Sequence, residues 1–148
     1  VGGRREFLRG RLAADLSLGA RVRFAGAQPH AAVARFLAAA DVLVLPSRAS
    51  ASWREQFGHV LVEAMAQGTA VIGSTCCAIP EGVGEAGLVF PEDYAGALAA
   101  HLATLAGEPA RARALGDAGR RRVAEHYTHE AIAARTRAFH EAVIRGSA

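Results

Sequence analysis

Between Asp41 and Gly68 the chain reads DVLVLPSRASASWREQFGHVLVEAMAQG. The apolar run Val42–Leu45, stopped by Pro46, is the pattern of a buried strand. A loop follows, and residues 58–67 have the apolar spacing of a helix that ends at Gly68. A strand that leads into a helix through a loop carrying an acid is how α/β proteins build phosphate and ribose sites.

The same alternation of strands and helices continues along the chain. Further strands are predicted at residues 21–25, 70–73 and 87–90, and further helices at 4–18, 30–40, 95–105, 109–126 and 131–143. Asp93 stands where the N-cap of the helix at 95–105 belongs, and Thr128 precedes the last helix. The strands are short apolar runs, which favours a parallel sheet covered on both faces. We therefore expect one doubly wound, Rossmann-like α/β domain over residues 1–148, with extra helices at its C-terminal end.

Bulk composition is that of a globular domain. The 148 residues are 51% hydrophobic and carry a formal net charge of +3, all of the basic side chains being arginine. No basic segment is interleaved with aromatic residues, so we expect no nucleic-acid partner. The two cysteines, Cys76 and Cys77, are neighbours without zinc-site spacing, which favours a reduced, cytoplasmic setting. Because the sequence begins Val-Gly-Gly without methionine, like the tail of a strand, we expect it to be a fragment truncated at its N-terminus.

The start of the helix at 58–67 is the candidate binding site. Unpaired amides at the first turn of a helix carry about half a positive charge and suit a phosphate or diphosphate. Gly58, lacking a side chain, would let an anion approach the backbone closely. Glu63, one to two turns into the helix, could accept two hydrogen bonds from a ribose diol, and Glu55 would face the group on the distal phosphate. The alternative is that both acids merely cap and solubilise the helix.

Several motifs in order resemble one enzyme family. They are VRFAG, ADVLVLPS, EQFGHVLVEAMAQGTAVIGS, AIPEGVGEAGLVFPED and HYTHEAIA. The series is similar to the C-terminal, donor-binding domain of GT-B glycosyltransferases, and most similar to the retaining enzymes of glycosyltransferase family 4. The resemblance implies transfer of a sugar from a nucleotide-diphosphate sugar, UDP- or GDP-linked, to an acceptor with retention of configuration.

The resemblance assigns roles to residues of the candidate site. Glu55 matches the glutamate that contacts the donor sugar near the reaction centre, and Glu63 the one that holds the nucleotide ribose. The stretch implied to bind the donor sugar and the diphosphate is Gln56, Phe57, Gly58, His59 and Val60. The family's phosphate-clamping Arg and Lys, and its acceptor-binding N-terminal domain, would lie before Val1. The resemblance therefore implies that this chain alone is inactive.

The sequence departs from the family pattern at Cys76-Cys77-Ala78, where glycine is usual. Nothing basic flanks Cys77, so we expect a small buried hydrophobe there and not a nucleophile. Because the chain has no DxD triad, we expect no metal ion and no cofactor besides the donor substrate. The run Arg120-Arg121-Arg122 favours a solvated helix face, or it could contact anionic lipid at the inner face of the membrane.

Three other functions stay open from the sequence. A nucleotide-sugar 2-epimerase of the same fold would need further catalytic acids and a histidine facing the sugar, for which His59 is the candidate. A binding-only module would keep the nucleotide-sugar site without the chemistry. A flavodoxin-like phosphate-binding fold would have no use for the pair Glu55 and Glu63.

Overall fold

The computed structural model describes residue 11 and residues 14–146. By its internal contacts the chain divides into two units, Val1–His30 and Ala31–Ala148, and each is described by itself. The described part of the first unit contains one short 3-10 helix, η1 (Gly19–Arg21). The helix expected at 4–18 lies largely outside the described residues.

The strand expected at 21–25 is a wrong prediction. Arg21 is the last residue of η1, and Val22 has extended dihedral angles but belongs to no strand. An extended segment becomes a strand only when a neighbouring strand takes up its backbone hydrogen bonds. Among the described residues none does so, and alternation of apolar and polar side chains was therefore insufficient.

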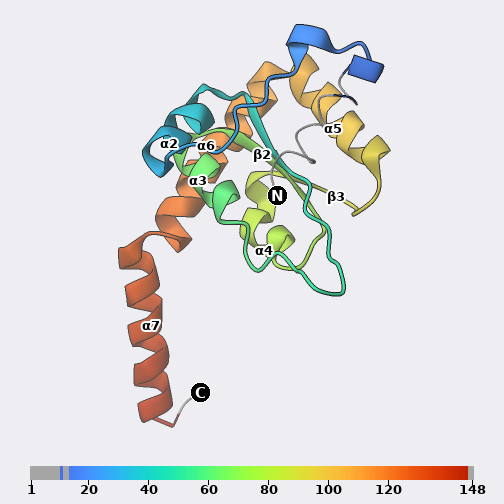
Figure 1. Ribbon diagram of the computed structural model, residues 1–148. Coiled ribbons are helices and arrows are strands. Elements are labelled where there is room, and N and C mark those ends of the chain that lie inside the picture. The colour runs from blue at the N-terminus through green and yellow to red at the C-terminus, as the bar shows by residue number, and fades with distance from the viewer. Residues whose placement is uncertain (1–10, 12–13, 147–148) are drawn as a thin grey trace. The chain divides into compact units, whose positions relative to one another are not determined.

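The elements from His30 onward follow the expected alternation, as Figure 1 shows. The helices are α2 (His30–Ala39), α3 (His59–Gln67), α4 (Ile79–Val83), η2 (Gly84–Ala86), α5 (Ala95–Gly107), α6 (Pro109–His126) and α7 (His129–Ile144). The strands are β1 (Val42–Leu45), β2 (Ala70–Ser74) and β3 (Leu88–Phe90). Every helix and strand predicted between residues 30 and 144 is present, within three residues at each end.

The three strands form one parallel sheet in the order β1-β2-β3. Val42 is paired with Ala70 in β2, and Ile72 of the same strand is paired with Leu88 in β3. Because the strands are parallel, their carboxyl ends share one edge, where α/β folds place their ligands. The loops that leave Leu45, Ser74 and Phe90 therefore start from a common edge.

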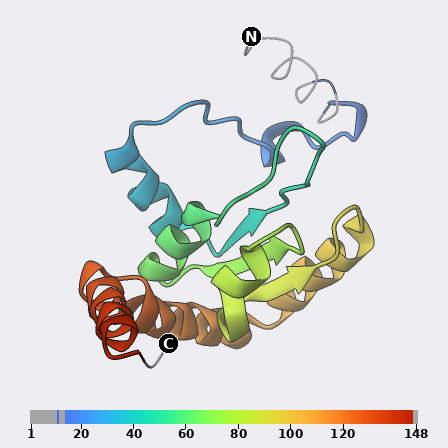
Figure 2. The same cartoon turned by 90° about the horizontal axis from the view of Figure 1, so that it is seen from below.

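Side chains alternate between two cores, one on each face of the sheet. In β2, Val71 belongs to the core that includes α3 and α4, whereas Ala70 and Ile72 belong to the core that α5 covers. Helix α6 contributes to both cores and runs along the sheet in Figure 2. Burial on both faces explains why the strands read as continuous apolar runs. The expected parallel α/β fold with helices on both faces is confirmed.

Glycines let α6 approach α3 and the turn after it. A methyl group on Gly116 would collide with the carbonyl oxygen of Gly68, and one on Gly119 would lie 2.9 Å from Met65 Cγ. Arg120 lies beside this contact and donates from Nη2 to the carbonyl oxygen of Gln67 at 2.8 Å. The guanidinium charge of Arg120 also interacts favourably with the negative, C-terminal end of the α3 dipole.

Two of the three consecutive arginines are thus structural. Besides Arg120, Arg122 donates from Nε to the Gly82 carbonyl oxygen at 3.0 Å and from Nη2 to that of Glu81 at 2.6 Å. Only the middle residue, Arg121, has no such bond among the described residues, and it is exposed. The prediction of a purely solvated face therefore missed that Arg120 and Arg122 bind the chain's own carbonyls.

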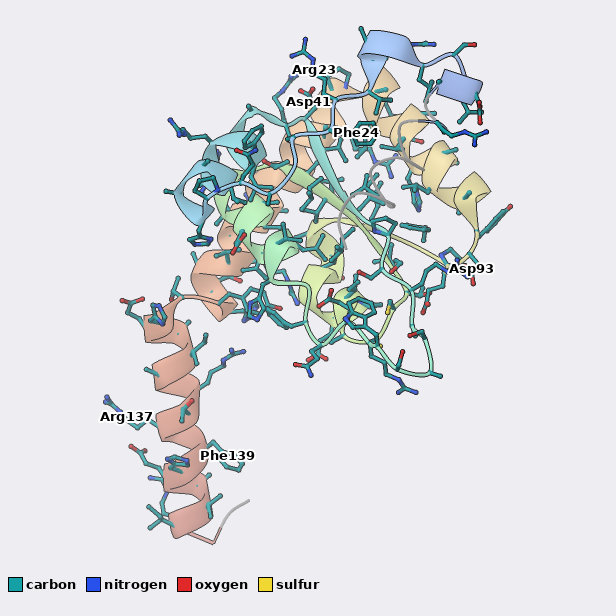
Figure 3. All side chains as sticks on the ribbon, viewed as in Figure 1. Arg23, Phe24, Asp41, Asp93, Arg137 and Phe139 are labelled. Atoms are coloured by element: carbon teal, nitrogen blue, oxygen red, sulfur yellow. The ribbon has the colours of Figure 1, made fainter. Side chains whose placement is uncertain are left out.

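Two local features differ from the sequence pattern, and a third agrees with it. Helix α4 was not predicted, because its five residues include a proline and a glycine. Asp93 does not cap α5: the cap position is Tyr94, and Asp93 instead has φ 63° and an ion pair with Arg48, Nε to Oδ1 2.5 Å. Figure 3 shows Asp93 at the turn before α5. Thr128, by contrast, does cap α7 by accepting the Ala131 amide at 3.1 Å.

Helix α7 extends beyond the layers of its unit and carries an exposed Phe139 (Figures 1 and 3). Among the described residues, no helix combines the length and the apolar character that a bilayer crossing requires.

The close contact of α6 predicts the effect of a small substitution. Gly116→Ala should lower the free energy of unfolding by roughly 1–3 kcal/mol, because the new methyl group meets backbone that cannot move cheaply. Gly107→Ala is the matched control, since its methyl group would meet nothing within 4 Å. Urea unfolding followed by circular dichroism measures both. Equal stability of the two variants would contradict the packing described here.

Candidate functional site

A long loop joins β1 to α3 and is tied down at the carboxyl edge of the sheet. Ser74, at the end of β2, donates its hydroxyl to the Ser47 carbonyl oxygen at 2.6 Å. Glu92, just after β3, accepts the amide of Ala49 at 2.8 Å through Oε2. Neighbouring strands thus fix the first part of the loop. Further along, the Ser50 hydroxyl accepts the amide of Trp53 at 3.0 Å.

Gly58 sets the direction in which α3 begins. Its backbone is left-handed, φ 76° and ψ 50°, a conformation that disfavours residues with a side chain. A methyl group here would lie 3.1 Å from Leu45 Cδ2 and 3.1 Å from Leu61 Cδ1, both in the core. The sequence suggested that this glycine leaves room for an anion. The structure gives it a different role, because the missing side chain would point into the core.

Glu55 caps the turn that precedes α3. Its Oε1 accepts the backbone amide of Gly58 at 3.0 Å and, at the longer distance of 3.5 Å, that of Phe57. Within the stretch implied to bind the donor, the amides of Phe57 and Gly58 therefore already face a carboxylate of the chain itself. The amides of His59 and Val60 form no hydrogen bond with any described residue. These two donors are the ones that the helix start leaves for a ligand.

Glu63 differs from Glu55. It is partly buried, yet its carboxylate has no hydrogen bond or ion pair with any described residue. Its neighbours Leu61, Ala64 and Met65 face the core. Glu63 lies four positions after His59, about 6 Å along the helix axis at ~1.5 Å per residue. The alternative that both acids only cap and solubilise the helix thus fits Glu55 as a cap, whereas Glu63 caps no group among the described residues.

The remaining predicted residues surround the helix start. Gln56 and His59 are exposed, whereas Phe57 is partly buried. The Phe57 ring makes edge contacts with the rings of His59, centroids 5.0 Å apart, and Tyr127, 5.4 Å apart. The Tyr127 hydroxyl in turn donates to the Gly82 carbonyl oxygen at 3.3 Å. Phe57 therefore connects the predicted stretch 55–60 to the junction of α6 and α7.

Sequence reasoning missed Tyr127 and Arg122 as neighbours of the site. Together with Phe57, Glu81 and Gly82 they line a hollow of about 450 Å³. A second hollow, of about 280 Å³, lies at the carboxyl edge between Ser47, Ser74 and Tyr94. Some 70 positions separate Phe57 from Tyr127, so no local pattern could have joined them; only the quoted HYTHEAIA motif pointed to that segment.

No metal centre is formed by the part of the chain that the structure describes, since it contains no group of three or more His, Cys, Asp or Glu side chains able to hold an ion. The arrangement instead offers amide donors, one capping carboxylate and one carboxylate without a partner. These groups suit an anionic ligand that also carries hydroxyl groups.

Substitutions of Glu55 and Glu63 should change stability to different extents, because only Glu55 caps the turn before α3. Glu55→Ala should cost roughly 1 kcal/mol of unfolding free energy, as loss of a helix-cap acceptor does. Glu63→Ala, in the next helix turn, should change stability by no more than about 0.5 kcal/mol. Denaturant titration measures both values, and hydrogen exchange at the Gly58 amide should accelerate only in the first variant. A larger loss in Glu63→Ala would show that its carboxylate has a structural partner.

The chain is similar to proteins that transfer sugars. It is 37% identical over 138 residues to the MMP alpha-(1->4)-mannosyltransferase of Mycolicibacterium hassiacum, covering 90% of this chain and 32% of that protein. It is 35% identical over 136 residues to the GDP-mannose-dependent monoacylated alpha-(1-6)-phosphatidylinositol monomannoside mannosyltransferase of Corynebacterium glutamicum, covering 90% and 35%.

A solved structure agrees with these relatives. Sucrose-phosphate synthase from Thermosynechococcus elongatus superposes with a TM-score of 0.77 at 38% identity, over 99% of this chain and 36% of that one. The chain thus spans about a third of the length of the proteins it matches. The family model described as glycosyl transferases group 1 matches residues 1–122. The chain belongs to the glycosyl transferases group 1 family.

Proposed function

We propose that this chain is the donor-binding half of a retaining glycosyltransferase that uses a nucleotide-diphosphate sugar. Membership of the glycosyl transferases group 1 family supports sugar transfer. The observation that carries the donor assignment is the start of α3. There, two amides stand at the positive end of a helix and a carboxylate follows one turn later, and none of the three is bonded to any residue that the structure describes.

Each group has a proposed role. The amides of His59 and Val60 bind the diphosphate, whose negative charge grows as the bond to the sugar breaks. Glu63 accepts hydrogen bonds from the two ribose hydroxyl groups. Glu55 keeps Oε1 on the Gly58 amide, so that Oε2 is the oxygen available to the donor sugar. Its fixed capping bond would hold that oxygen in place before the sugar arrives.

For the donor, only the class of nucleotide base and of sugar is proposed. One relative is named as a GDP-mannose-dependent mannosyltransferase and one other as a mannosyltransferase, which supports a GDP- or UDP-linked hexose as donor. The acceptor would be bound by a second domain, as the resemblance to family 4 implies. We place the enzyme in the cytoplasm. Because Arg120 and Arg122 are bound to backbone carbonyls, attachment to anionic lipid would depend on Arg121 and residues elsewhere.

The isolated chain should bind the donor without turning it over. Isothermal titration with GDP, UDP and their hexose conjugates measures the binding. Glu63→Ala should weaken the preferred nucleotide about 10- to 100-fold, the cost of losing hydrogen bonds to a charged acceptor. The matched control is Glu130→Ala, an exposed acid at the start of α7. Equal affinity of the two variants, or no binding by the unmodified chain, would contradict the proposed donor site.

Two rival functions predict different outcomes with the donor. A nucleotide-sugar 2-epimerase would release a free epimer and would depend on His59, whose ring packs against Phe57. A binding-only module would hold the donor and release no nucleotide with any acceptor. Mass spectrometry of products from a protein that includes this chain and its acceptor domain distinguishes them. A glycoside whose anomeric configuration matches that of the donor is the result expected from our proposal.

A further inference from the structure

Two guanidinium groups line the hollow of about 450 Å³ that Phe57 shares with the junction of α6 and α7. Arg122 comes from α6, and Arg135 comes from the first half of α7. Arg135 donates from Nη2 to the His126 carbonyl oxygen at 2.8 Å. Arg122 donates from its own Nη2 to the Tyr127 hydroxyl at 3.4 Å. Two cations from different helices are therefore anchored on adjacent residues of the junction.

The chain neutralises neither of these positive charges. The carbonyl and hydroxyl oxygens that accept hydrogen bonds from Arg122 and Arg135 carry no net charge. Neither guanidinium forms an ion pair with a residue that the structure describes. Arg122 is partly buried, and its Cζ lies 5.7 Å from the centroid of the Tyr127 ring. Because a cation that has lost part of its water is costly without a counter-charge, this hollow favours an anion.

The other charged groups do not reverse the sign of the hollow. Glu81 also lines it and is exposed, and its carboxylate has no partner among the described residues. His126 lies with Nε2 3.8 Å from the Glu125 carboxylate, which is not part of the lining. With His126 neutral, two arginines against one glutamate leave the lining with a formal charge of +1.

The free donors and the walls indicate the kind of anion. Nε and Nη1 of Arg135, and Nη1 of Arg122, donate to no residue that the structure describes. Planar guanidinium groups bind phosphate with paired, charge-assisted hydrogen bonds. Beside them, the rings of Phe57 and Tyr127 and the side chain of Ala78 form apolar walls. The volume lies within the range of ligand pockets, about 300–1,000 Å³, so the hollow has room for more than a phosphate group.

The turn that leads to Ala78 contains the two cysteines. Cys76 is completely buried in the core, whereas Cys77 is exposed. The expectation that Cys77 is a small buried hydrophobe is therefore wrong, and Cys76 has that environment. Cys77 also has a left-handed backbone, φ 52°, a conformation that suits the glycine of the family pattern.

We propose that this hollow is a second anion site, which binds a small phosphate monoester. Arg122 and Arg135 hold the phosphate group, and the rings of Phe57 and Tyr127 contact the rest of the ligand. The site is distinct from the start of α3, where backbone amides are the donors. Phe57 belongs to both places, since its ring also contacts that of His59. A ligand in the hollow therefore touches a residue of the candidate donor stretch.

The test titrates inorganic phosphate and phenyl phosphate into the isotope-labelled 148-residue chain at constant ionic strength. Amide resonances of Gly82 and Tyr127 and the Nε–H resonance of Arg135 should shift in a saturable way in NMR spectra. Phenyl phosphate should bind about 2- to 10-fold more tightly than inorganic phosphate, because its ring contacts the aromatic walls. Equal affinity for the two probes would overturn the role of the rings.

Substitutions at the hollow should act in opposite directions. Arg135→Gln should weaken phenyl phosphate roughly 5- to 10-fold, through loss of charge-assisted hydrogen bonds. Glu81→Gln should strengthen it about 2- to 5-fold, because a like charge is removed. The matched control is Arg137→Gln, an exposed position on the same helix that does not line the hollow (Figure 3). Affinity in that variant should stay unchanged. Should Arg135→Gln fail to fold, the direction of the Glu81→Gln effect still decides.

Two results would overturn the second site. One is an equal effect of Arg135→Gln and Arg137→Gln, which indicates general attraction of anions to a basic helix. The other is a set of phosphate-induced shifts confined to the start of α3. Glu63→Ala separates this proposal from the proposed function, since phosphate binding in the hollow should be unaffected there. Loss of nucleotide binding with an intact hollow would count against the donor site alone.

Discussion

The left-handed backbone at Gly58 is the constraint on which the rest of the site depends. It turns the chain from an irregular loop into α3 at a point where an added methyl group would lie 3.1 Å from the side chains of Leu45 and Leu61 and 3.5 Å from that of Ile79. The same turn presents the Gly58 amide to the Glu55 carboxylate. With the direction of α3 fixed in this way, the helix start does not fray. The amides of His59 and Val60, which bond to no described residue, therefore have a defined position.

The parallel sheet determines where that turn lies. Since β1, β2 and β3 end at one edge, the loop after β1 can be anchored by residues that follow the other two strands. Ser74 and Glu92 supply those anchors, to Ser47 and Ala49 respectively. The apolar cores on both faces hold the strands in register. The hydrogen bonds from Ser74 and to Glu92 restrain the loop relative to these strands. A binding group on such a loop is pre-organised, which lowers the entropy lost when a ligand binds.

Arg122 of α6 and Tyr127, which follows α6, make polar contacts with the elements around the site. Arg122 binds the carbonyl oxygens at the end of α4, and Tyr127 reaches the same carbonyl group of Gly82 while its ring meets Phe57. Buried carbonyl groups at helix ends need such donors, because no helical amide follows to satisfy them. The junction of α6 and α7 is thus connected to the helix start through direct contacts.

Apart from the short α4 and η2, the sequence by itself determined the order and type of the elements between residues 30 and 144. The spacing of apolar residues, Gly68 at the end of α3, Pro109 at the start of α6 and the Thr128 cap are local signals, each set by residues a few positions apart. They also located the candidate site at residues 55–63. The resemblance to a sugar-transferring family was likewise a property of the sequence alone, and the comparisons support that family.

Only the tertiary structure decided what individual side chains do there. Arg120 and Arg121 are identical neighbours, yet one binds a carbonyl 53 positions away and the other faces solvent. Cys76 is buried and Cys77 is exposed, and residues 21–25 lack the partner that a strand needs among the described residues. The physical reason is the same in each case. Backbone conformation responds to nearby residues, whereas burial and hydrogen-bond partners depend on segments that meet only when the chain has folded.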